Sequence, residues 1–239
     1  SDSIATSASC SSEASTCRAM APAICSWTSC CDVTSDSRLI VISFCATIAS
    51  GSDDKELMAV DNNPASPFYG RLYVAWTDFG SGARIYSTFS SNAGATWSAQ
   101  LALSAAGVDV QGAWPTVAPN GDVWVAWLRW NPWPSGPMDI EIARSTNGGA
   151  SYTLVANPMT GGGNPQDATS TGNCGRPALK GNIRYLPSPQ IAVGPDGVVH
   201  VIYAKDPDGM GSGDVVNSYY RRSTTNGASW GTEVQLNDV

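Results

Sequence analysis

The sequence predicts an all-β protein, specifically a β-propeller built from four-stranded antiparallel blades. The first observation is that residues 53–239 consist of strand-sized runs of alternating apolar and polar residues separated by Gly, Asn, Asp and Pro, with no apolar stretch at helical spacing. The second is that a polar octet ending in an aromatic residue occurs three times, as SSNAGATW (90–97), STNGGASY (145–152) and STTNGASW (223–230). Repetition at periods in the tens of residues is typical of repeat architectures.

Each octet occupies the same place in a longer unit of four strands. A short apolar strand and a tight turn come first, followed by a strongly apolar strand, a variable loop, a third strand, the octet and a fourth strand. The second strands are RLYVAWTDF (71–79), DVWVAWLRW (122–130) and VVHVIYAKD (198–206). The third strands are ARIYSTF (83–89), IEIARS (140–145) and NSYYRRS (217–223), and the fourth are WSAQLALS (97–104), YTLVANP (152–158) and WGTEVQLN (230–237). Four antiparallel strands per repeat are typical of propeller blades. We expect about three blades, at residues 53–104, 113–157 and 188–238.

The octet is expected to close the hairpin between the third and fourth strands of each blade. Its Ser and Asn side chains can bond local backbone N–H groups, its Gly supplies the positive φ of a tight turn, and its aromatic ring packs between sheets. These positions are structural, and we assign them no chemistry. They are Ser90, Asn92, Gly94, Trp97, Ser145, Asn147, Gly149, Tyr152, Ser223, Gly227 and Trp230.

The octets resemble the Asp-box, or BNR, repeat of the sialidase superfamily, Ser-x-Asp-x-Gly-x-Thr-Trp. The segments DKELMAVDNNPASPFYGRLYVAWTDF and GDVVNSYYRRSTTNGASWGTEVQLNDV are also similar to bacterial sialidase-like BNR-repeat proteins, so the resemblance runs from about residue 53 to the end. The sequence departs from the pattern at the Asp position, which holds Asn92, Asn147 and Thr225. The resemblance implies a sialidase-like propeller and a glycan, or a sialoside, as the partner.

Sialidases of this superfamily have six blades, so three blades make a partial propeller. The chain is then a piece of a longer propeller, or half of a ring closed by a second copy. An open propeller leaves unpaired strand edges and an uncovered blade face. Homo-oligomerisation through these edges is therefore expected.

Charge and hydropathy argue against nucleic acid as a partner and against a membrane span. The 239-residue chain has a formal net charge of −7, which makes it a poor ligand for nucleic acid. Its longest apolar run, LIVISFCATIA at 39–49, is too short to span a membrane. The chain begins with Ser1 and shows no signal-peptide pattern, so either a targeting segment was removed or the chain is a fragment.

Residues 1–52 form a separate Ser/Thr/Cys-rich segment, expected to be irregular or a partial blade. Six of the seven cysteines lie in it, at spacings that match no zinc site. A disulfide-stapled segment of a secreted protein is the interpretation we adopt, and a poorly ordered tract is the alternative. An odd number of cysteines leaves at least one thiol free or paired between chains.

Function is expected on the face opposite the octets. The loops between second and third strands and the links between blades lie there, and they are long and rich in Trp, Arg and Asp. The resemblance places the sialidase pocket on the same face. Candidate ligand-binding residues are Trp130 and Trp133, Arg176, Arg184 and Tyr185 in the long link, and Asp78 and Asp206 at the ends of second strands.

Each candidate has a structural alternative. The two tryptophans offer flat apolar surfaces to sugar rings, or they pack over the propeller rim. Arg176 and Arg184 suit a sialic-acid carboxylate, or they bond loop carbonyls. Asp78 and Asp206, read as matching positions, serve as a general acid or as turn caps.

Metal and catalytic sites receive no assignment. We expect no cofactor; DPDGMGSGD (206–214) leaves calcium open through Asp206, Asp208 and Asp214, but it lacks the bidentate Glu and the spacing of an EF-hand. His200 reads as a packed strand residue.

The resemblance implies a tyrosine nucleophile activated by a glutamate, an aspartate acid and three arginines. The family's Arg-Ile-Pro motif is absent, and neither Glu141 nor Glu233 is placed near the expected pocket.

Three functions follow from these observations. The first is a secreted sialidase-like propeller that recognises glycans. The second is an exo-α-sialidase or other glycoside hydrolase whose site is incomplete in this chain. The third is a structural protein that self-assembles through its blade edges.

Overall fold

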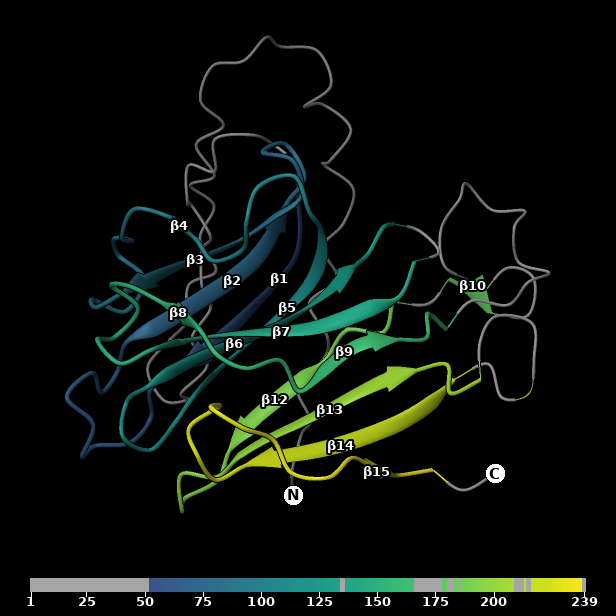
Figure 1. The fold of residues 1–239 in the computed structure, drawn as a ribbon. Coiled ribbons are helices and arrows are strands. Elements are labelled where there is room, and N and C mark those ends of the chain that lie inside the picture. The colour runs from purple at the N-terminus through teal and green to yellow at the C-terminus, as the bar shows by residue number, and fades with distance from the viewer. Residues whose placement is uncertain are drawn as a thin grey trace, which may run out of the picture. The chain divides into compact units, whose positions relative to one another are not determined.

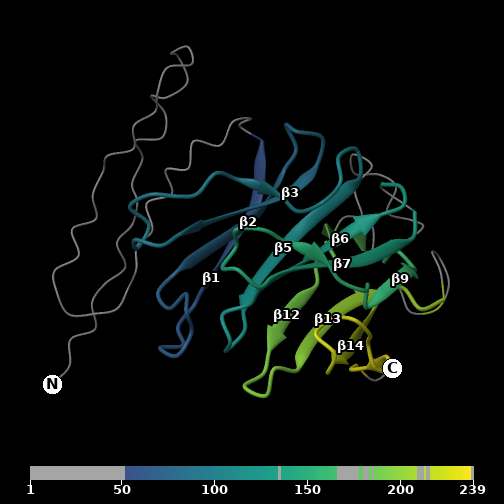
Figure 2. The ribbon, with the colours of Figure 1, turned by 60° about the vertical axis from the view of Figure 1, so that its left-hand side comes forward.

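The computed structural model describes residues 52–133, 136–165, 186–208 and 216–237, with Gly213 and the backbone of 178–179 and 183–184. These residues belong to the second of two units into which the chain divides, residues 46–239. They form strands and no helix, arranged in three four-stranded antiparallel sheets (Figures 1 and 2). The predictions for the cysteine-rich segment fall outside the described residues.

Each sheet follows the predicted order of four strands. Blade 1 contains β1 (Asp53–Val60), β2 (Leu72–Asp78), β3 (Arg84–Ser90) and β4 (Leu101–Ala102). Blade 2 contains β5 (Asp109–Val117), β6 (Val123–Trp130), β7 (Met138–Ser145) and β8 (Thr153–Leu154), with β9 (Met159–Gly162) also paired to β7. Blade 3 contains β12 (Gln190–Val193), β13 (Val199–Lys205), β14 (Asn217–Ser223) and β15 (Val234–Gln235). The hairpin β10 (Ala178–Leu179) and β11 (Ile183–Arg184) lies between blades 2 and 3 in the sequence.

Blade 2 differs from expectation at both of its edges. Its first strand starts at Asp109, because a bulge between Gln111 and Trp114 lets pairing with β6 continue on both sides of the irregularity. Gly112 in this bulge has φ 74°, and a Cβ there would lie 2.1 Å from the Ser188 hydroxyl. The outer strand is split into β8 and β9, which pair with opposite ends of β7.

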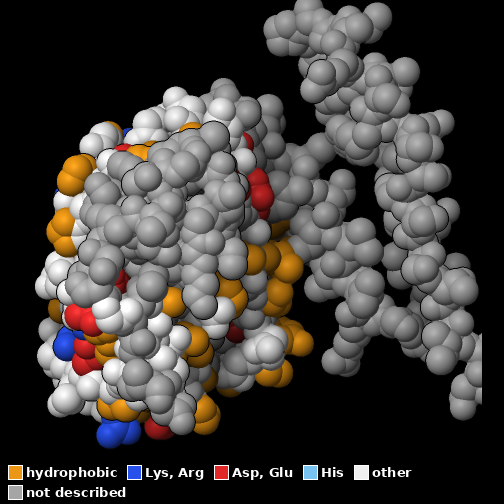
Figure 3. Space-filling model, turned by 90° about the vertical axis from the view of Figure 1, so that its right-hand side faces the viewer, with side chains coloured by type: hydrophobic (Ala, Val, Ile, Leu, Met, Phe, Trp, Pro, Cys, Tyr) orange, Lys and Arg blue, Asp and Glu red, His pale blue; other side chains and the backbone are white. Residues whose placement is uncertain are grey.

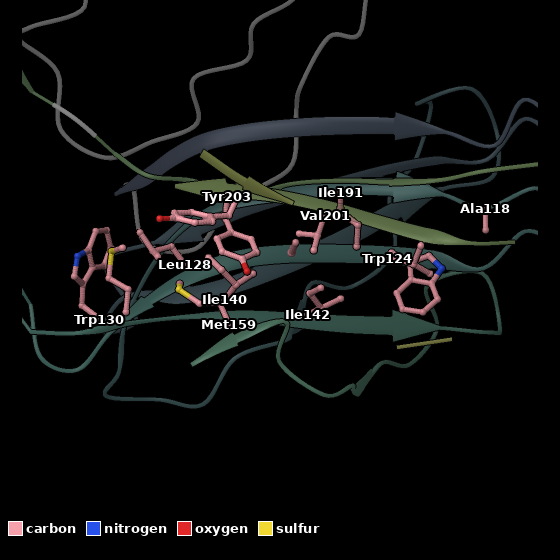
Figure 4. Close-up of a cluster of buried hydrophobic side chains, with 14 residues drawn as sticks. Ala118, Trp124, Leu128, Trp130, Ile140, Ile142, Met159, Ile191, Val201 and Tyr203 are labelled. Carbon is pink, nitrogen blue, oxygen red and sulfur yellow. The ribbon is translucent and has the colours of Figure 1, made fainter. Parts of the chain in front are cut away.

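Strand β6 lies between the other two blades and is packed on both faces. Val125 and Trp127 belong to a cluster shared with blade 1. The alternate residues from Trp124 to Trp130 belong to a larger cluster shared with blade 3, which includes Ile191, Val201 and Tyr203 (Figure 4). Burial on both faces explains why this strand is nearly continuous in apolar residues.

The three octets form the same turn. Ser145 Oγ accepts a hydrogen bond from Gly149 N at 2.9 Å and donates one to Asn147 Oδ1, which also accepts from Ser151 N at 3.0 Å. Ser90 and Asn92 repeat these bonds in blade 1. In blade 3 the hydroxyl of Thr225 takes the place of the amide oxygen. The two central residues have positive φ in every octet, as in Gly148 and Gly149. The outer strands that follow are two residues each, shorter than expected.

The described residues contain no helix that could span a bilayer.

Candidate functional site

A pocket of about 630 Å³ opens on the face opposite the octets, between the first strands of blades 1 and 2. Figure 3 looks onto this face, where hydrophobic and acidic side chains lie at the surface. The wall is built by the start of β1, the loop after β2, the start of β5 and the end of β6. Its lining residues are Ser52, Asp53, Asp54, Phe79, Ala83, Asp109, Val110, Gln111, Trp130 and Trp133.

Trp130 and Trp133 both line the pocket, and each fits one of the two interpretations of the sequence. Trp130 is only 2% exposed and packs in the cluster between blades 2 and 3. Trp133 is half-buried and meets the Trp130 ring edge-on at a centroid distance of 4.7 Å. Its backbone N–H donates to Asp109 Oδ2 at 2.9 Å, which ties the loop to β5. The second ring is thus held at the pocket wall by the first ring and by β5.

The Trp130 indole nitrogen has no hydrogen-bond partner and is fully buried. In Figure 4 this nitrogen lies at the end of the cluster, on the side away from Leu128. An unsatisfied buried N–H costs about 1–3 kcal/mol, so a structure that retains one carries a cost that a bound acceptor would remove. Trp124 Nε1 is buried and unpartnered in the same way, although Trp124 does not line this pocket.

Asp53 supplies a second unusual group. It lies opposite Asp78 in the β1–β2 ladder, and its Oδ1 is buried without a hydrogen-bond partner. Burial raises the pKa of Asp53, and the charges of Asp78 and Glu56 raise it further, while the Trp76 indole acts in the opposite sense. The carboxyl therefore holds its proton to a higher pH than an ordinary aspartate.

Asp78 and Asp206 are turn caps, and they do not occupy matching positions as the sequence suggested. Asp78 Oδ1 accepts from Gly80 N at 2.7 Å and from Ser81 N at 3.2 Å. Asp206 Oδ1 accepts from Asp208 N at 3.1 Å. The ladders place Lys205 at the position equivalent to Asp78, so Asp206 lies one residue further along its chain. Neither side chain lines the pocket described above.

The remaining candidates of the long link stay predictions. Arg176 and Tyr185 lie outside the described residues, and Arg184 is described only as backbone in β11. Asp214 of the calcium alternative also lies outside them. Within the described part of the chain, no three His, Cys, Asp or Glu side chains are grouped so that they could hold a metal ion.

Glu141 in β7 and Glu233, just before β15, are each bound by a cation and an aromatic donor, and neither lines the pocket. Glu141 accepts from Trp127 Nε1 at 2.9 Å and from Arg129 at 3.0 Å. Glu233 accepts from Tyr203 Oη and Lys205 Nζ, both at 2.5 Å.

Burial opposes ionisation of Glu233, but hydrogen bonds from Lys205 and Tyr203, with the charges of Lys205 and Arg221, outweigh it and lower its pKa. In blade 1 the position of the cation is held by Asp78, itself a carboxylate. This difference between the blades is consistent with the opposite pKa shift of Asp53.

His200 lies in β13, as expected of a strand residue. Its ring is stacked on Tyr220, and Nδ1 is 2.7 Å from the Tyr220 hydroxyl.

The sequence analysis missed Asp53, Asp54, Asp109 and Gln111. Each lies at the start of the first strand of a blade, where the strand emerges on the octet-free face. The signal was present in the pairs of acidic and polar residues that precede the apolar part of each first strand. These residues were not selected because the first strands were assigned from their apolar ends.

No family model matches the chain, and no curated protein matches it. Among solved structures, it superposes on the GH93 α-L-arabinofuranosidase of Fusarium graminearum with a TM-score of 0.55 at 14% identity, over 79% of this chain and 49% of that one. The α-L-arabinanase of Penicillium chrysogenum gives 0.52 at 15% identity, over 77% and 50%. A Hadza microbial sialidase gives 0.50 at 14% identity, over 76% and 37%.

The chain has a sialidase-like β-propeller fold. Identities this low show the fold alone. This sialidase-like propeller spans between 37% and 50% of the length of the three solved proteins, in keeping with the three blades of a partial propeller.

Proposed function

We propose that this sialidase-like propeller recognises glycans in the pocket between β1 and β5. The observations that carry the proposal are the Trp133 ring and the carboxyl groups of Asp54 and Asp109 in the pocket wall. The indole N–H of Trp130, which is buried without a partner, is a further donor that a sugar hydroxyl reaches if the ring turns toward the pocket. The glycoside hydrolases with the same fold support a glycan as the ligand class.

The rest of the wall suits the other surfaces of a sugar. The Trp133 ring is a flat apolar surface for a face of C–H groups. Asp54, Asp109 and Gln111 place oxygen acceptors on β1 and β5 for the hydroxyls that sugars donate. A cavity of about 630 Å³ lies within the roughly 300–1,000 Å³ typical of small-molecule sites.

Titration calorimetry with arabinobiose tests the proposal, because two proteins of the same fold were solved with this disaccharide. Trp130→Phe keeps an aromatic ring but removes the indole donor, and we expect about tenfold weaker binding, or roughly 1.4 kcal/mol. Trp124→Phe is the matched control. It lies on the same face of β6, it is 1% exposed and its indole nitrogen is also unpartnered, but it does not line the pocket.

Equal loss of affinity in the two variants would assign the effect to packing. A folded protein that binds neither arabinobiose nor any member of a broad glycan array would refute glycan recognition.

Secretion belongs to the same proposal. The cysteine-rich segment supports it, because disulfides form in oxidising compartments. Mass spectrometry of protein exported to an oxidising compartment should find the cysteines of residues 1–52 in disulfides. Fully reduced cysteines there would contradict secretion.

Glycoside hydrolysis is a second candidate, favoured by Asp53. A carboxyl that keeps its proton at raised pH suits a general acid, which protonates the leaving oxygen as the glycosidic C–O bond breaks. Release of reducing ends from arabino-oligosaccharides, or of fluorophore from a generic α-sialoside, would establish turnover. It should be lost in Asp53→Asn while binding is retained. A folded chain that binds sugar without releasing product is a recognition module.

A further inference from the structure

We infer that the pocket selects uncharged sugars and discriminates against sugars that carry a carboxylate, such as sialosides. The inference rests on the proposed glycan recognition and specifies its ligand class. It runs against the sialoside expected from the resemblance to sialidases, and three features of the wall carry it.

The first feature is the charge of the lining. Asp53, Asp54 and Asp109 contribute carboxyl groups, and the described lining contains no Lys, Arg or His. A sugar carboxylate in the pocket would lie among groups of its own sign. Like charges repel strongly in a site that is partly shielded from water.

The second feature is the position of the nearby cations, which are engaged elsewhere. Lys55 forms an ion pair with Asp54. Arg84 donates to the backbone oxygen of Ser104 at 3.1 Å. Arg129 pairs with Glu141 at 3.0 Å on the blade 2 sheet. Each of these cations therefore already has a partner in the free protein.

The third feature is the raised pKa of Asp53 within the wall. Burial and the neighbouring Asp78 raise the pKa of Asp53, so the free site already disfavours ionisation there. A ligand anion beside Asp53 would meet the same penalty. A neutral polyol instead donates hydroxyl hydrogen bonds to these carboxyl oxygens and adds no charge.

A glycan array of matched pairs tests the inference. Each neutral oligosaccharide is printed beside a counterpart bearing one carboxylate, for example lactose with sialyllactose, and cellobiose with its uronic acid. We expect the neutral members to bind at least about tenfold more tightly. The difference should narrow at high salt, because screening weakens repulsion.

Two variants sharpen the test. Phe79 lines the pocket and is 42% exposed, so Phe79→Arg adds a cation without emptying the core, and it should shift preference toward the acidic member of each pair. Phe79→Gln is its uncharged control and should leave the preference unchanged. The same shift in both variants would show that charge is not the determinant.

The remaining outcomes separate this inference from the proposed function. Equal or tighter binding of sialyllactose overturns the inference and leaves glycan recognition standing. Loss of that binding in Arg176→Ala would trace it to an arginine of the long link. If no member of any pair binds to the folded protein, glycan recognition fails and this inference fails with it.

Discussion

Asp53 and Asp78 pair directly across the β1–β2 ladder, and both are carboxylates. In blades 2 and 3 the position of Asp78 is held by Arg129 and Lys205, each bound to a glutamate. Blade 1 thus has a carboxylate where the other blades have a cation, and Asp53 lies directly across the ladder from it. The first two predictions follow from this difference.

Asp53→Asn should raise the free energy of unfolding relative to the wild-type protein, and this difference should grow as the pH rises. The pKa of Asp53 is raised on folding, so above the ordinary Asp value of about 4 the folded state binds more protons than the unfolded state. The stability of the wild-type protein therefore falls as the pH rises from the unfolded to the folded pKa of Asp53. The variant has no carboxyl at this position and does not lose stability in this way. Urea unfolding at several pH values between 3 and 7 measures it. A stability difference independent of pH would contradict the assigned shift.

Glu233→Gln should show the opposite dependence. The pKa of Glu233 is lowered on folding, so its contribution is present at neutral pH and is lost as the pH falls through the folded value. We expect a cost of about 1 kcal/mol at pH 7, since the ion pair with Lys205 is partly exposed. The cost should shrink below about pH 4. Glu56→Gln, on the exposed middle of β1, is the control and should have little effect.

Ser145→Ala should destabilise the octet turn of blade 2. Ser145 is 1% exposed, and its hydroxyl bonds to Gly149 N and to Asn147, so the substitution leaves a buried N–H unsatisfied. We expect a loss of about 1–3 kcal/mol in the free energy of unfolding. Thr146→Ala, at the exposed next position, should change it by less than about 0.5 kcal/mol. Similar losses of stability in the two variants would show that the Ser145 hydroxyl does not stabilise the turn.

The face of blade 3 that points away from blade 2 should bind a second copy of the chain. Ile202, Tyr220 and Val234 lie in one row across β13, β14 and β15, and Ile202 and Val234 are 39% and 49% exposed. The positions in blade 2 equivalent to Ile202 and Tyr220 are Ala126 and Ile142, which are buried against blade 3.

Subunit mass by light scattering should report a dimer, and Ile202→Asp should give a folded monomer. A monomeric wild-type protein at tens of micromolar would contradict this prediction.

The sequence was sufficient for the blade order because each octet marks the same hairpin. Ser90, Ser145 and Ser223 set the register of three strands at once, so the second and third strands were placed within one or two residues. The outer strands were overestimated because the residues after Trp97, Tyr152 and Trp230 make few ladder pairs. The split into β8 and β9 depends on the Asp139 contacts, such as the bond from Gly161 N, which no local pattern indicates.

Two of the residues that line the pocket were among the candidates from the sequence. Trp130 and Trp133 were found because large aromatics in a short polar loop are conspicuous. Asp53 and Asp109 were missed because their importance arises only where the first strands of two blades meet, a contact between residues far apart in the sequence. The one-residue offset between Asp78 and Asp206 likewise depends on ladder register.

The indole N–H of Trp130 gives the most direct test of glycan recognition. Its ¹H–¹⁵N resonance, assigned from its disappearance in Trp130→Phe, is followed while arabinobiose and then the neutral array ligands are added. The account predicts a saturable shift of this resonance and none for the indole of Trp124, on the same face of β6. Binding that leaves the Trp130 resonance unmoved, or that moves both equally, would contradict a ligand site at the pocket between β1 and β5.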